Sequence, residues 1–597
     1  MKRYLVLPFI AVYVFLVLEF IIVKNEKTDI EVTGHEEAVI PENGYFRTES
    51  DNILLDSLSI FCQELLGRPT TNSITINACA NKSLNVYFEY GLDSNNYTNQ
   101  TGVITTLDSI PFNVKITGLN PNTRYYYRMK YRPTGTLTYF TRSSHTFMTK
   151  RQAGSTFTFA IEADPHMDTN SLSSVYTLTL QNMKLRNPDF LIDLGDTFMS
   201  EKLVTRTPVT IRDRHLLLRS YFDLICHSVP LYLALGNHEG ECGWYRDTTS
   251  GNNFPVWASN SRTLYYPNPI PDTVFYSGNT KSEPFVGLRQ NYYSWEWGNC
   301  LFVVIDPYWY TMTKPGWNWT LGQTQFNWFK NALTNSNAKF KFVFCHQVVG
   351  GNGTDGRGGT EIAHLFENGG RNLDSTWGFD TYRSGWGGKP IHQLMVDNKV
   401  NIFFHGHDHF FGYQMKDGVI YQELPQPSSK SYTNISATQY GYLNGVFIPS
   451  RGYALMTISG SSAKLEYIRT YLPSEENASR HNLDVSYSYT IDTLGTVIGI
   501  NEPGINLPNE YSLSQNYPNP FNPVTKINYS IPTTDFVQLK IYDLMGREIT
   551  TLVNEYQKPG EYSITFDADR FSLPSGMYFY RLTGNNFTRS MKMIYLK

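Results

Sequence analysis

The stretch FLIDLGD, from Phe190 to Asp196, is an apolar run that ends abruptly in a glycine and a carboxylate. Five further segments share this pattern of a short apolar run closed by a polar residue: FTFAIEAD (157–164), LYLALGN (231–237), CLFVVID (300–306), FKFVFCH (340–346) and NIFFHGH (401–407). Such runs are typical of strands that are buried on both faces. Amphipathic segments at 172–183 and 322–333 lie between them. The sequence therefore predicts an α/β layered domain over residues 154–470.

The ends of the predicted strands carry most of the reactive side chains of this region. In α/β domains ligands collect beyond the carboxyl ends of strands, because several loops converge there. Five of the six ends supply Asp164-Pro165-His166, Gly195-Asp196, Gly236-Asn237-His238-Glu239, His346 and Gly406-His407-Asp408-His409. Imidazoles and carboxylates suit Zn, Mn and Fe, and a carboxylate can bridge two ions. One such piece alone is common and a buried histidine is more often structural, but the ordered set indicates a dinuclear metal site.

These motifs resemble the calcineurin-like metallophosphoesterase superfamily, whose pattern is D-x-H, G-D-x-x, G-N-H-[DE], a lone H and G-H-x-H. The resemblance covers residues 157–470 and implies a metallophosphoesterase α/β-sandwich. It also implies two sets of metal ligands: Asp164, His166 and His409 for the first ion, and Asn237, His346 and His407 for the second, with Asp196 as the bridge. His238 is implied to be the general acid that faces the scissile bond.

The charges of this set favour an anionic substrate. Two divalent ions bring +4, whereas Asp164, Asp196 and a bridging hydroxide bring −3, which leaves roughly +1 to attract a phosphate. Coordination lowers the pKa of water from about 15.7 toward about 7, so a metal-bound hydroxide can attack directly without a serine or cysteine nucleophile. The expected cofactors are two divalent metal ions, Zn, Mn or Fe.

The order of a sandwich domain before the catalytic domain is similar to that of the purple acid phosphatases, but two residues depart from their pattern. Their first motif ends in glycine where this chain has His166, and their metal-binding tyrosine is replaced by Met199. A set with an added imidazole and no phenolate lacks the hard oxygen donor that favours ferric iron. The departure predicts a colourless divalent pair.

The segment HGHDH contains three histidines, of which the motif uses two. Alternate residues of a strand point to the same side. The two ligands could therefore be His405 and His407, or His407 and His409. The family pattern favours the second pair, and Gly406 before His407 lets the backbone turn close to the metals. His405 is then expected to have a packing or supporting role.

Three charged residues near the motifs are candidates for supporting roles. Asp193 and Asp408 lie beside predicted ligands and are candidate acceptors for imidazole N–H groups, with a solvated or capping role as the alternative. Arg357 lies in the glycine-rich stretch 350–361 and is a candidate phosphate clamp, with a surface loop as the alternative.

Residues from about 70 to 150 alternate apolar and polar positions between turn residues, which predicts a small antiparallel sandwich. Leu119, Pro121, Thr123, Tyr125 and Tyr127 resemble the L-x-P-x-T-x-Y-x-Y corner of fibronectin type III domains, in which a tyrosine hydroxyl ties a loop back to the sheet. A tyrosine-rich edge strand without such a corner is the alternative.

The tail returns to short strands. Its segments QNYPNPFNPVTKINYSIP (515–532), VQLKIYDLMGREI (537–549), GEYSITFDA (560–568) and LPSGMYFYRL (573–582) resemble the C-terminal sorting domain of type IX secretion substrates. The resemblance covers the whole tail and implies export across an outer membrane with the type IX machinery as partner. Without it, the tail is a small β-sandwich that could serve as a binding module.

Residues 1–23 place two basic residues before a long apolar run, which predicts a secretory signal peptide, with an uncleaved signal anchor as the alternative. Both export the rest of the chain, so membrane contact is expected only through this segment. The six cysteines form no C-x-x-C pair, which excludes a zinc ribbon or a thioredoxin-like motif. Two possibilities remain open for the cysteines: disulfides in the pairs Cys62–Cys79 and Cys226–Cys242, or buried free thiols.

Length and charge set the remaining limits. The 597 residues are expected to divide into several domains, and the net charge of −3 offers no basic excess for a nucleic-acid backbone. The predicted division is a signal segment (1–23), a connector (24–69), a fibronectin type III-like domain (70–153), the catalytic domain (154–470), a second connector (471–509) and the sorting domain (510–597).

Together these patterns predict a secreted or surface phosphoesterase that hydrolyses small phosphomonoesters, with His238 as general acid. A phosphodiesterase or nucleotidase of the same superfamily is one alternative. The other is a non-catalytic surface binding protein with structural metals, against which the uncoordinated His238 beside an open centre counts.

Overall fold

The computed structural model describes residues 58–272, 274–501, 511–532, 535–557, 560–585 and 587–597. The predicted export segment, residues 1–23, lies outside these residues. None of the helices in the described ranges is long and apolar enough to cross a bilayer. All six cysteines are free and buried, so the structure contains neither of the two disulfides considered above.

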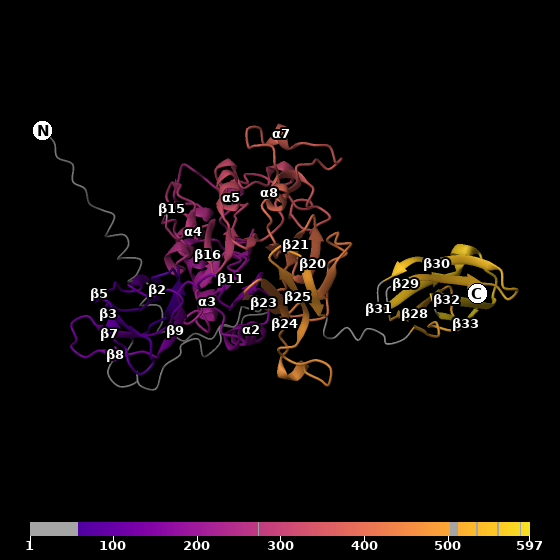
Figure 1. Cartoon of the computed structure of the whole chain (residues 1–597), viewed down its shortest axis with the longest axis horizontal. Coiled ribbons are helices and arrows are strands. Elements are labelled where there is room, and N and C mark those ends of the chain that lie inside the picture. Colours follow the sequence, from indigo (N-terminus) through magenta and orange to yellow (C-terminus); the bar gives the residue numbers. More distant parts are fainter. Residues whose placement is uncertain (1–57, 273, 502–510, 533–534, 558–559, 586) are drawn as a thin grey trace, which may run out of the picture. The chain divides into compact units, whose positions relative to one another are not determined.

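The N-terminal part, indigo in Figure 1, consists of two antiparallel sheets. One contains β1 (Cys62–Gly67), β2 (Ser73–Cys79) and β6 (Phe112–Thr117), and the other contains β3 (Leu84–Gly91), β4 (Asn99–Gln100), β5 (Ile104–Thr105), β7 (Arg124–Pro133), β8 (Phe140–Thr141) and β9 (His145–Met148). Every second residue of β7 is buried, as period-two alternation requires. The Tyr125 hydroxyl accepts a hydrogen bond from the Asn120 N–H at 2.9 Å, which is the tie that the predicted corner needs. That the sandwich is a fibronectin type III domain stays a prediction.

The catalytic region contains two large sheets. The first runs in the order β12 (Leu231–Leu233), β11 (Leu191–Asp193), β10 (Phe157–Glu162), β23 (Gly452–Ser459), β24 (Ser462–Arg469), β25 (Val485–Asp492) and β26 (Val497–Asn501). The second runs in the order β13 (Ser277–Gly278), β16 (Tyr293–Trp297), β17 (Cys300–Val304), β18 (Phe340–Phe344), β19 (Ile402–His405), β21 (Val419–Glu423), β20 (Phe410–Lys416) and β22 (Val446–Pro449). A small hairpin, β14 (Ser282–Glu283) and β15 (Gly287–Leu288), lies beside them.

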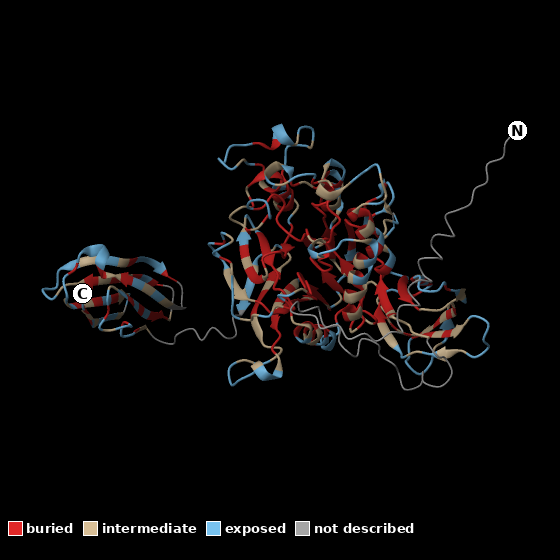
Figure 2. Ribbon diagram, turned by 180° about the vertical axis from the view of Figure 1, so that it is seen from behind, coloured by how far each residue is buried: buried red, intermediate tan, exposed pale blue. Residues whose placement is uncertain are grey.

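The two sheets pack face to face over an aromatic core. Phe159 and Ile161 of β10 meet Phe302 of β17, Phe342 of β18 and Phe404 of β19 in one buried cluster. The intervening Ala160 of β10 belongs to a second cluster on the opposite face of its sheet. Because both faces of these strands are buried, their sequences are continuous apolar runs. Figure 2 shows the buried strands as a red interior beneath a paler surface.

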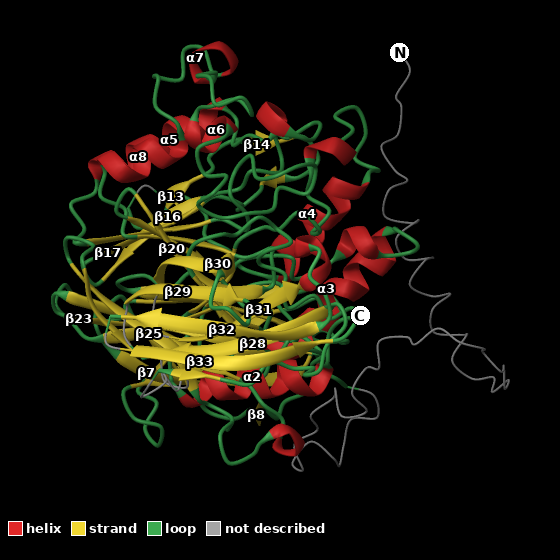
Figure 3. Cartoon of the chain, turned by 90° about the vertical axis from the view of Figure 1, so that its right-hand side faces the viewer, coloured by secondary structure: helices red, strands yellow, loops and turns green. Residues whose placement is uncertain are grey.

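Helices cover the outer face of each sheet, which completes a four-layer α/β-sandwich and confirms the predicted fold of this region. One layer comprises α2 (Ser173–Leu185) and α3 (Pro208–Phe222), with α4 (Phe254–Tyr265) against α3; the other comprises α5 (Gln323–Asn335), α6 (Phe366–Gly369), α7 (Phe379–Tyr382) and α8 (Ile391–Asp397). Figure 3 shows α5 and α8 near the top of the view and α2 near the bottom. α3 begins where Thr207 accepts from the Thr210 N–H and Pro208 occupies the first turn. Both features satisfy the free donors of a helix start.

Strand direction decides where the reactive residues meet. β10, β11 and β12 run parallel, and so do β17, β18, β19 and β21. Parallel strands end at the same edge of a sheet, so the polar residues that follow them gather there.

The strands extend somewhat beyond the predicted boundaries of the domains. β1 begins at Cys62, within the predicted connector 24–69, and pairs with β2 of the sandwich. β25 and β26 lie within the predicted connector 471–509 and continue the first catalytic sheet. We therefore propose that the sandwich begins near residue 62 and that the catalytic region continues to about residue 501.

The tail, described by itself, is a β-sandwich. One sheet contains β27 (Ser512–Leu513), β28 (Val524–Ile531) and β31 (Gly560–Asp567), and the other contains β30 (Glu548–Gln557), β29 (Asp535–Tyr542), β32 (Gly576–Gly584) and β33 (Phe587–Tyr595). Ile527 of the first sheet and Leu539 and Tyr580 of the second belong to one buried core.

Candidate metal centre

Within the described ranges, two groups of acidic and histidine side chains are arranged closely enough to hold a metal ion. The first consists of Asp164, His166 and His409, whose ligand atoms all lie within 4.8 Å of one another. The Oδ1 of Asp164 lies 3.4 Å from the Nε2 of His166 and 3.3 Å from the Nε2 of His409. Ligands about 2.1 Å from a common ion stand roughly 3.0–3.4 Å apart, so these separations fit one shared ion.

The second group consists of Asp196, His346 and His407. The Nε2 of His346 lies 3.3 Å from the Oδ2 of Asp196. The same Asp196 oxygen lies 3.9 Å from the Nε2 of His166 in the first group, and His346 lies 3.8 Å from the Oδ1 of Asp164. Asp196 therefore stands between the two groups, where a bridging carboxylate would have to lie.

Four atoms of these two groups, and one of Asn237, which follows Gly236 beside Asp196, have no hydrogen-bond partner among the described residues. They are buried and comprise Asp164 Oδ1, His166 Nε2, Asp196 Oδ2, Asn237 Oδ1 and His346 Nε2. A buried polar atom without a partner costs about 1–3 kcal/mol, so five together require an explanation. Metal ions held by the two groups would satisfy the four atoms that belong to them, and the residues present therefore fit a pair of ions.

The electrostatics of the groups also favour cations. Burial alone raises the pKa of Asp164 and Asp196, but neighbouring histidines, His346 above all, bring both pKa values well below the usual range. Burial lowers the pKa of His346, yet Asp196 and Asp164 outweigh it and raise that pKa to about 9. Burial lowers the pKa of His407 and leaves its imidazole neutral, the form that binds metals.

The backbone brings these side chains together at some conformational cost. Asp164, His166, Asp196, His407 and His409 all have positive φ angles between 52° and 81°. Non-glycine residues rarely adopt this left-handed conformation, and it is concentrated at functional sites.

Two glycines permit the close approach of the loops. A Cβ on Gly236 would stand 2.2 Å from the Asp196 Oδ1, and one on Gly406 would stand 2.6 Å from the Asp164 Oδ2. Glycine is therefore required at both positions, as the sequence suggested for Gly406.

Backbone groups orient the candidate ligands. The Asp164 Oδ2 accepts from the His407 N–H at 2.8 Å, and the Asp196 Oδ1 accepts from the His238 N–H at 2.8 Å. The second ring nitrogens of two histidines contact carbonyl oxygens: His346 Nδ1 meets Leu194 at 3.1 Å, and His407 Nε2 meets Asp355 at 2.7 Å. Such contacts fix the tautomer and the orientation of a ligating imidazole.

His238 lies beside the two groups without belonging to either. Its Nδ1 is 2.7 Å from the Oε2 of Glu201, and its Nε2 faces the Asp196 Oδ2 at 4.0 Å. Tyr245 donates its hydroxyl to the other Glu201 oxygen at 2.6 Å. Hydrogen bonds from His238 and Tyr245 outweigh burial and lower the pKa of Glu201. Glu201 thus holds the ring so that Nε2 points toward the site.

Glu201 was not among the residues predicted from the sequence. It lies on a single turn, η3 (Ser200–Lys202), five residues after Asp196 and 37 residues before His238. Its only sequence signal is an acidic residue shortly after the G-D motif, which is too common to be specific.

Arg214 of α3 was also missed. It is largely buried and donates to the carbonyl oxygens of His166, Met167 and Phe198, and thereby ties the loop after β10 to the loop after β11. The sequence contains no signal for this role, because the arginine lies 48 residues from His166.

The contacts of Asp193 and Asp408 favour the alternative to the imidazole-acceptor role, and the phosphate-clamp role of Arg357 stays a prediction. Asp193 accepts from the Gly195 N–H at 2.9 Å and the Thr197 hydroxyl at 2.5 Å, so it shapes the turn and contacts no imidazole. Asp408 pairs with Arg357 at 2.9 Å and accepts from the Tyr442 hydroxyl at 2.8 Å. Arg357 also donates to the His407 carbonyl at 2.8 Å, so it ties the glycine-rich loop to the segment of a candidate metal ligand.

His405 lies outside both groups. Its Nδ1 is 2.6 Å from the Oε2 of Glu423, and both side chains are buried. Burial lowers the pKa of His405 to about 3, so the ring is neutral. This environment is that of a packed side chain at the end of β19.

We predict that His405→Ala retains the metal content and much of the activity, whereas His407→Ala and His409→Ala each lower both. His407 and His409 belong to the two groups, whereas His405 belongs to neither and lies against Glu423. Elemental analysis of the three purified variants, with a thermal unfolding midpoint for each, checks this. If His405→Ala lost a metal ion and His409→Ala did not, the ligands would be His405 and His407 instead of His407 and His409.

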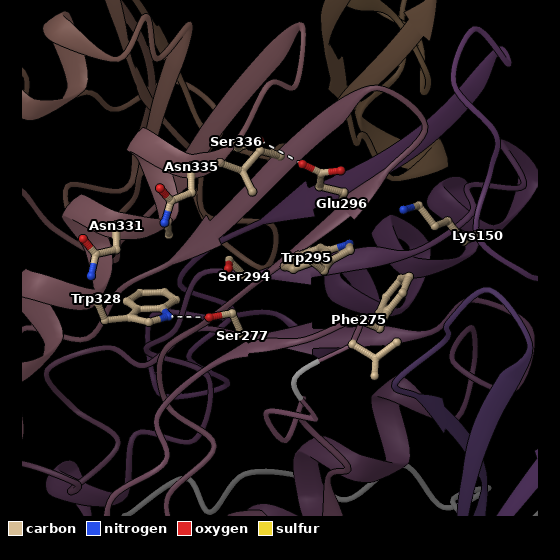
Figure 4. A pocket seen from close by; sticks show the side chains of 13 residues that line it. Lys150, Phe275, Ser277, Ser294, Trp295, Glu296, Trp328, Asn331, Asn335 and Ser336 are labelled. Carbon is tan, nitrogen blue, oxygen red and sulfur yellow. Dashed lines mark hydrogen bonds between the residues drawn. The ribbon is translucent and has the colours of Figure 1, made fainter.

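A separate hollow of about 340 Å³ lies between α5 and the strands β13, β16 and β17 (Figure 4). Trp328, Trp295 and Phe275 contribute to its lining, and the Trp328 Nε1 donates to the Ser277 hydroxyl at 2.9 Å. None of the predicted metal ligands lines it. The convergent strand ends, and not this hollow, are the candidate functional site.

Comparison with known proteins agrees with this architecture. A family model described as calcineurin-like phosphoesterase matches residues 157–411, and one described as a secretion system C-terminal sorting domain matches residues 515–596. A solved structure of PhoD aligns with 74% of this chain and 92% of its own, at 16% identity and a TM-score of 0.53. The structure of the purple acid phosphatase PPD1 from yellow lupin (Lupinus luteus) aligns with 72% of this chain and 74% of its own, at 15% identity and a TM-score of 0.48. No curated protein matches the chain.

The likeness to PhoD is one of fold, and the two family models identify the domains. The first model begins at Phe157 of β10 and ends at Phe411, just beyond the G-H-x-H motif, so it spans all the candidate ligands. Residues 157–411 are therefore a calcineurin-like phosphoesterase domain, which makes the chain a metal-dependent phosphoester hydrolase, and residues 515–596 are a sorting domain for export by type IX secretion to the cell surface or the outside.

Proposed function

We propose that this protein hydrolyses small phosphomonoesters outside the cytoplasm at a centre of two divalent metal ions, with His238 as general acid. The observation that carries the proposal is that two adjacent groups contain four buried, unpaired ligand atoms, with His238 directed at the same place. A purely structural metal site needs no such uncoordinated histidine.

In this proposal the ligand sets are those that the motifs imply. Asp164, His166 and His409 hold one ion; Asn237, His346 and His407 hold the other, with Asp196 shared. The unpaired Oδ1 of Asn237 supports its place in the second set. When bound, the two ions would supply Lewis-acid chemistry, lowering the pKa of bound water and offsetting phosphate charge.

The residues of the chain supply the proton chemistry. His238 holds a proton on Nε2 for the oxygen of the leaving group. Glu201 accepts from Nδ1 and keeps the ring oriented, and Tyr245 holds Glu201 in turn. A positioned general acid contributes about 10²- to 10⁴-fold to such a reaction.

Met199 supports a colourless, divalent pair. It is 3% exposed and stands where purple acid phosphatases have a tyrosine ligand, so no phenolate is available at that position. With two carboxylates, an amide and four imidazoles, the set suits Zn, Mn or Fe in the divalent state.

We predict that purified protein contains two divalent ions per chain, has no visible absorption band, and loses hydrolysis when a chelator removes the ions. Elemental analysis, an absorption spectrum and a panel of phosphate mono- and diesters check this. Monoesters should be turned over faster than diesters of the same leaving group. Active protein with only a trace of metal would contradict the proposal. A preference for diesters would change the proposed substrate class from phosphomonoesters to phosphodiesters.

A further inference from the structure

Three aromatic residues form a continuous wall beside the candidate centre, here called the aromatic wall: Tyr308, Trp244 and Tyr245. The ring of Tyr308 lies 6.3 Å from that of His346 and 6.3 Å from that of Trp244. Trp244 lies 6.1 Å from Tyr245, whose hydroxyl binds Glu201. The wall thus runs from a candidate ligand of the second group to the partner of His238.

The wall is held rigidly to the loop that carries His238. Trp244 and Tyr245 lie on the short turn η4 (Gly243–Tyr245), and the Gly243 N–H donates to the Tyr308 carbonyl at 3.0 Å. A Cβ on Gly243 would stand 2.6 Å from the Trp309 carbonyl oxygen, so the two segments are in close contact. The Cys242 thiol donates to the Asn237 carbonyl at 3.3 Å. These contacts fix the wall relative to Asn237 and His238.

Lys314 places a positive charge on this wall. Its ammonium nitrogen lies 4.2 Å from the ring centre of Trp244 and 5.3 Å from that of Trp319. The side chain is only partly buried, and it makes no hydrogen bond or ion pair with any residue in the described ranges. Its charge is one of those that counteract burial and lower the pKa of Glu201, so it lies within electrostatic reach of the His238 pair.

Of the other charges nearby, Lys202 is exposed to solvent and the rest are engaged. Glu201 is paired with His238, and Arg206, which lies over the Tyr245 ring at 5.3 Å, donates to the Glu201 carbonyl. Arg246 faces Glu283 at 3.9 Å. An ammonium has three donors, and those of Lys314 have no protein acceptor in the described residues.

A general acid protonates the oxygen of the leaving group, so the leaving group lies on the His238 side of the phosphate. We propose that Lys314, together with Trp244 and Tyr245, the partly exposed residues of the aromatic wall, forms a subsite that selects phosphomonoesters whose leaving group carries a further negative charge next to a planar group. This inference rests on the proposed function and names its substrate class.

Two esters with leaving groups of equal shape test the subsite: 4-carboxyphenyl phosphate, whose leaving group is anionic, and 4-carbamoylphenyl phosphate, whose leaving group is neutral. The metal-loaded full chain is compared with Lys314→Met and Lys314→Arg. Lys314→Met should lower kcat/KM for the carboxylate ester by at least about fivefold, the effect of an ion pair of about 1 kcal/mol, and by less than about twofold for the carboxamide. Lys314→Arg, which keeps the charge, should retain most of the preference.

The matched control is Lys202→Met, which removes an exposed lysine adjacent to Glu201 and should leave the ratio of the two esters unchanged. An equal loss on both esters in Lys314→Met, with an unchanged unfolding midpoint, would make Lys314 a positioning residue for the wall and overturn the subsite. No loss on either ester would also overturn it. The wild-type protein tests the proposed function separately. If the wild-type protein hydrolysed neither ester, the proposed function itself would be contradicted.

Discussion

Replacing Asp196 with asparagine is expected to remove at least one metal ion per chain and to lower hydrolysis by about 10³-fold or more. The Oδ2 of Asp196 lies 3.3 Å from His346 and 3.9 Å from His166, so it is close to a histidine of each group, as the proposed bridge requires. Asparagine keeps the shape and tolerates the φ of 52°, but it removes the negative charge. Elemental analysis and kcat/KM for a phosphomonoester measure both effects.

The matched control lies at the other end of the same strand. Asp189 precedes β11, is buried, and pairs with Arg151 at 2.7 Å, whereas Asp196 follows the strand. Asp189→Asn should lower the unfolding midpoint and leave metal content and turnover unchanged. If Asp196→Asn retained both ions and wild-type activity, Asp196 would not bridge the ions and the dinuclear centre would be wrong.

Replacing His238 with alanine is expected to leave the metal content intact and to lower turnover by about 10²- to 10⁴-fold. His238 lies outside both candidate ligand groups, while its Nε2 faces Asp196 at 4.0 Å. Removing the ring therefore removes a proton donor and no ligand. Elemental analysis and kcat of the same preparation separate these two effects.

Leaving-group chemistry sharpens the test of His238. Esters of acidic phenols need little protonation of the departing oxygen, so His238→Ala should lose much less activity on them than on alkyl phosphates. Glu201→Gln should show the same trend with a smaller loss, of about 10-fold, because it only weakens the hold on the ring.

The exposed His481 provides a control, and His481→Ala should behave as wild type. Unchanged turnover of alkyl phosphates in His238→Ala would remove His238 from its role, and a loss independent of the leaving group would assign it to binding the phosphate.

The sequence by itself determined the catalytic fold and the identity of the candidate ligands. Buried strands of the two sheets are continuous apolar runs, because both faces are covered, and each run stops at the residue where the chain leaves the core. Asp164, Asp196, Asn237 and His346 therefore stand out in the sequence as polar residues that end such runs. Parallel strands make those ends meet, so order along the chain was enough to predict that they converge.

Only the tertiary structure decided the contacts between segments that are far apart in the sequence, because no periodic pattern relates such segments to one another. Glu201 reaches His238 across 37 residues from the short turn η3, and the Asp355 carbonyl orients His407 across 52 residues from a loop. Arg357 lies in a glycine-rich stretch that suggested a substrate loop, but in the folded chain its charge is taken by Asp408. Lys314, on the aromatic wall, is by contrast a partly buried cation without a partner in the described residues. Which cation is left without a partner depends on how the loops pack, and packing of loops leaves no hydrophobic pattern in the sequence.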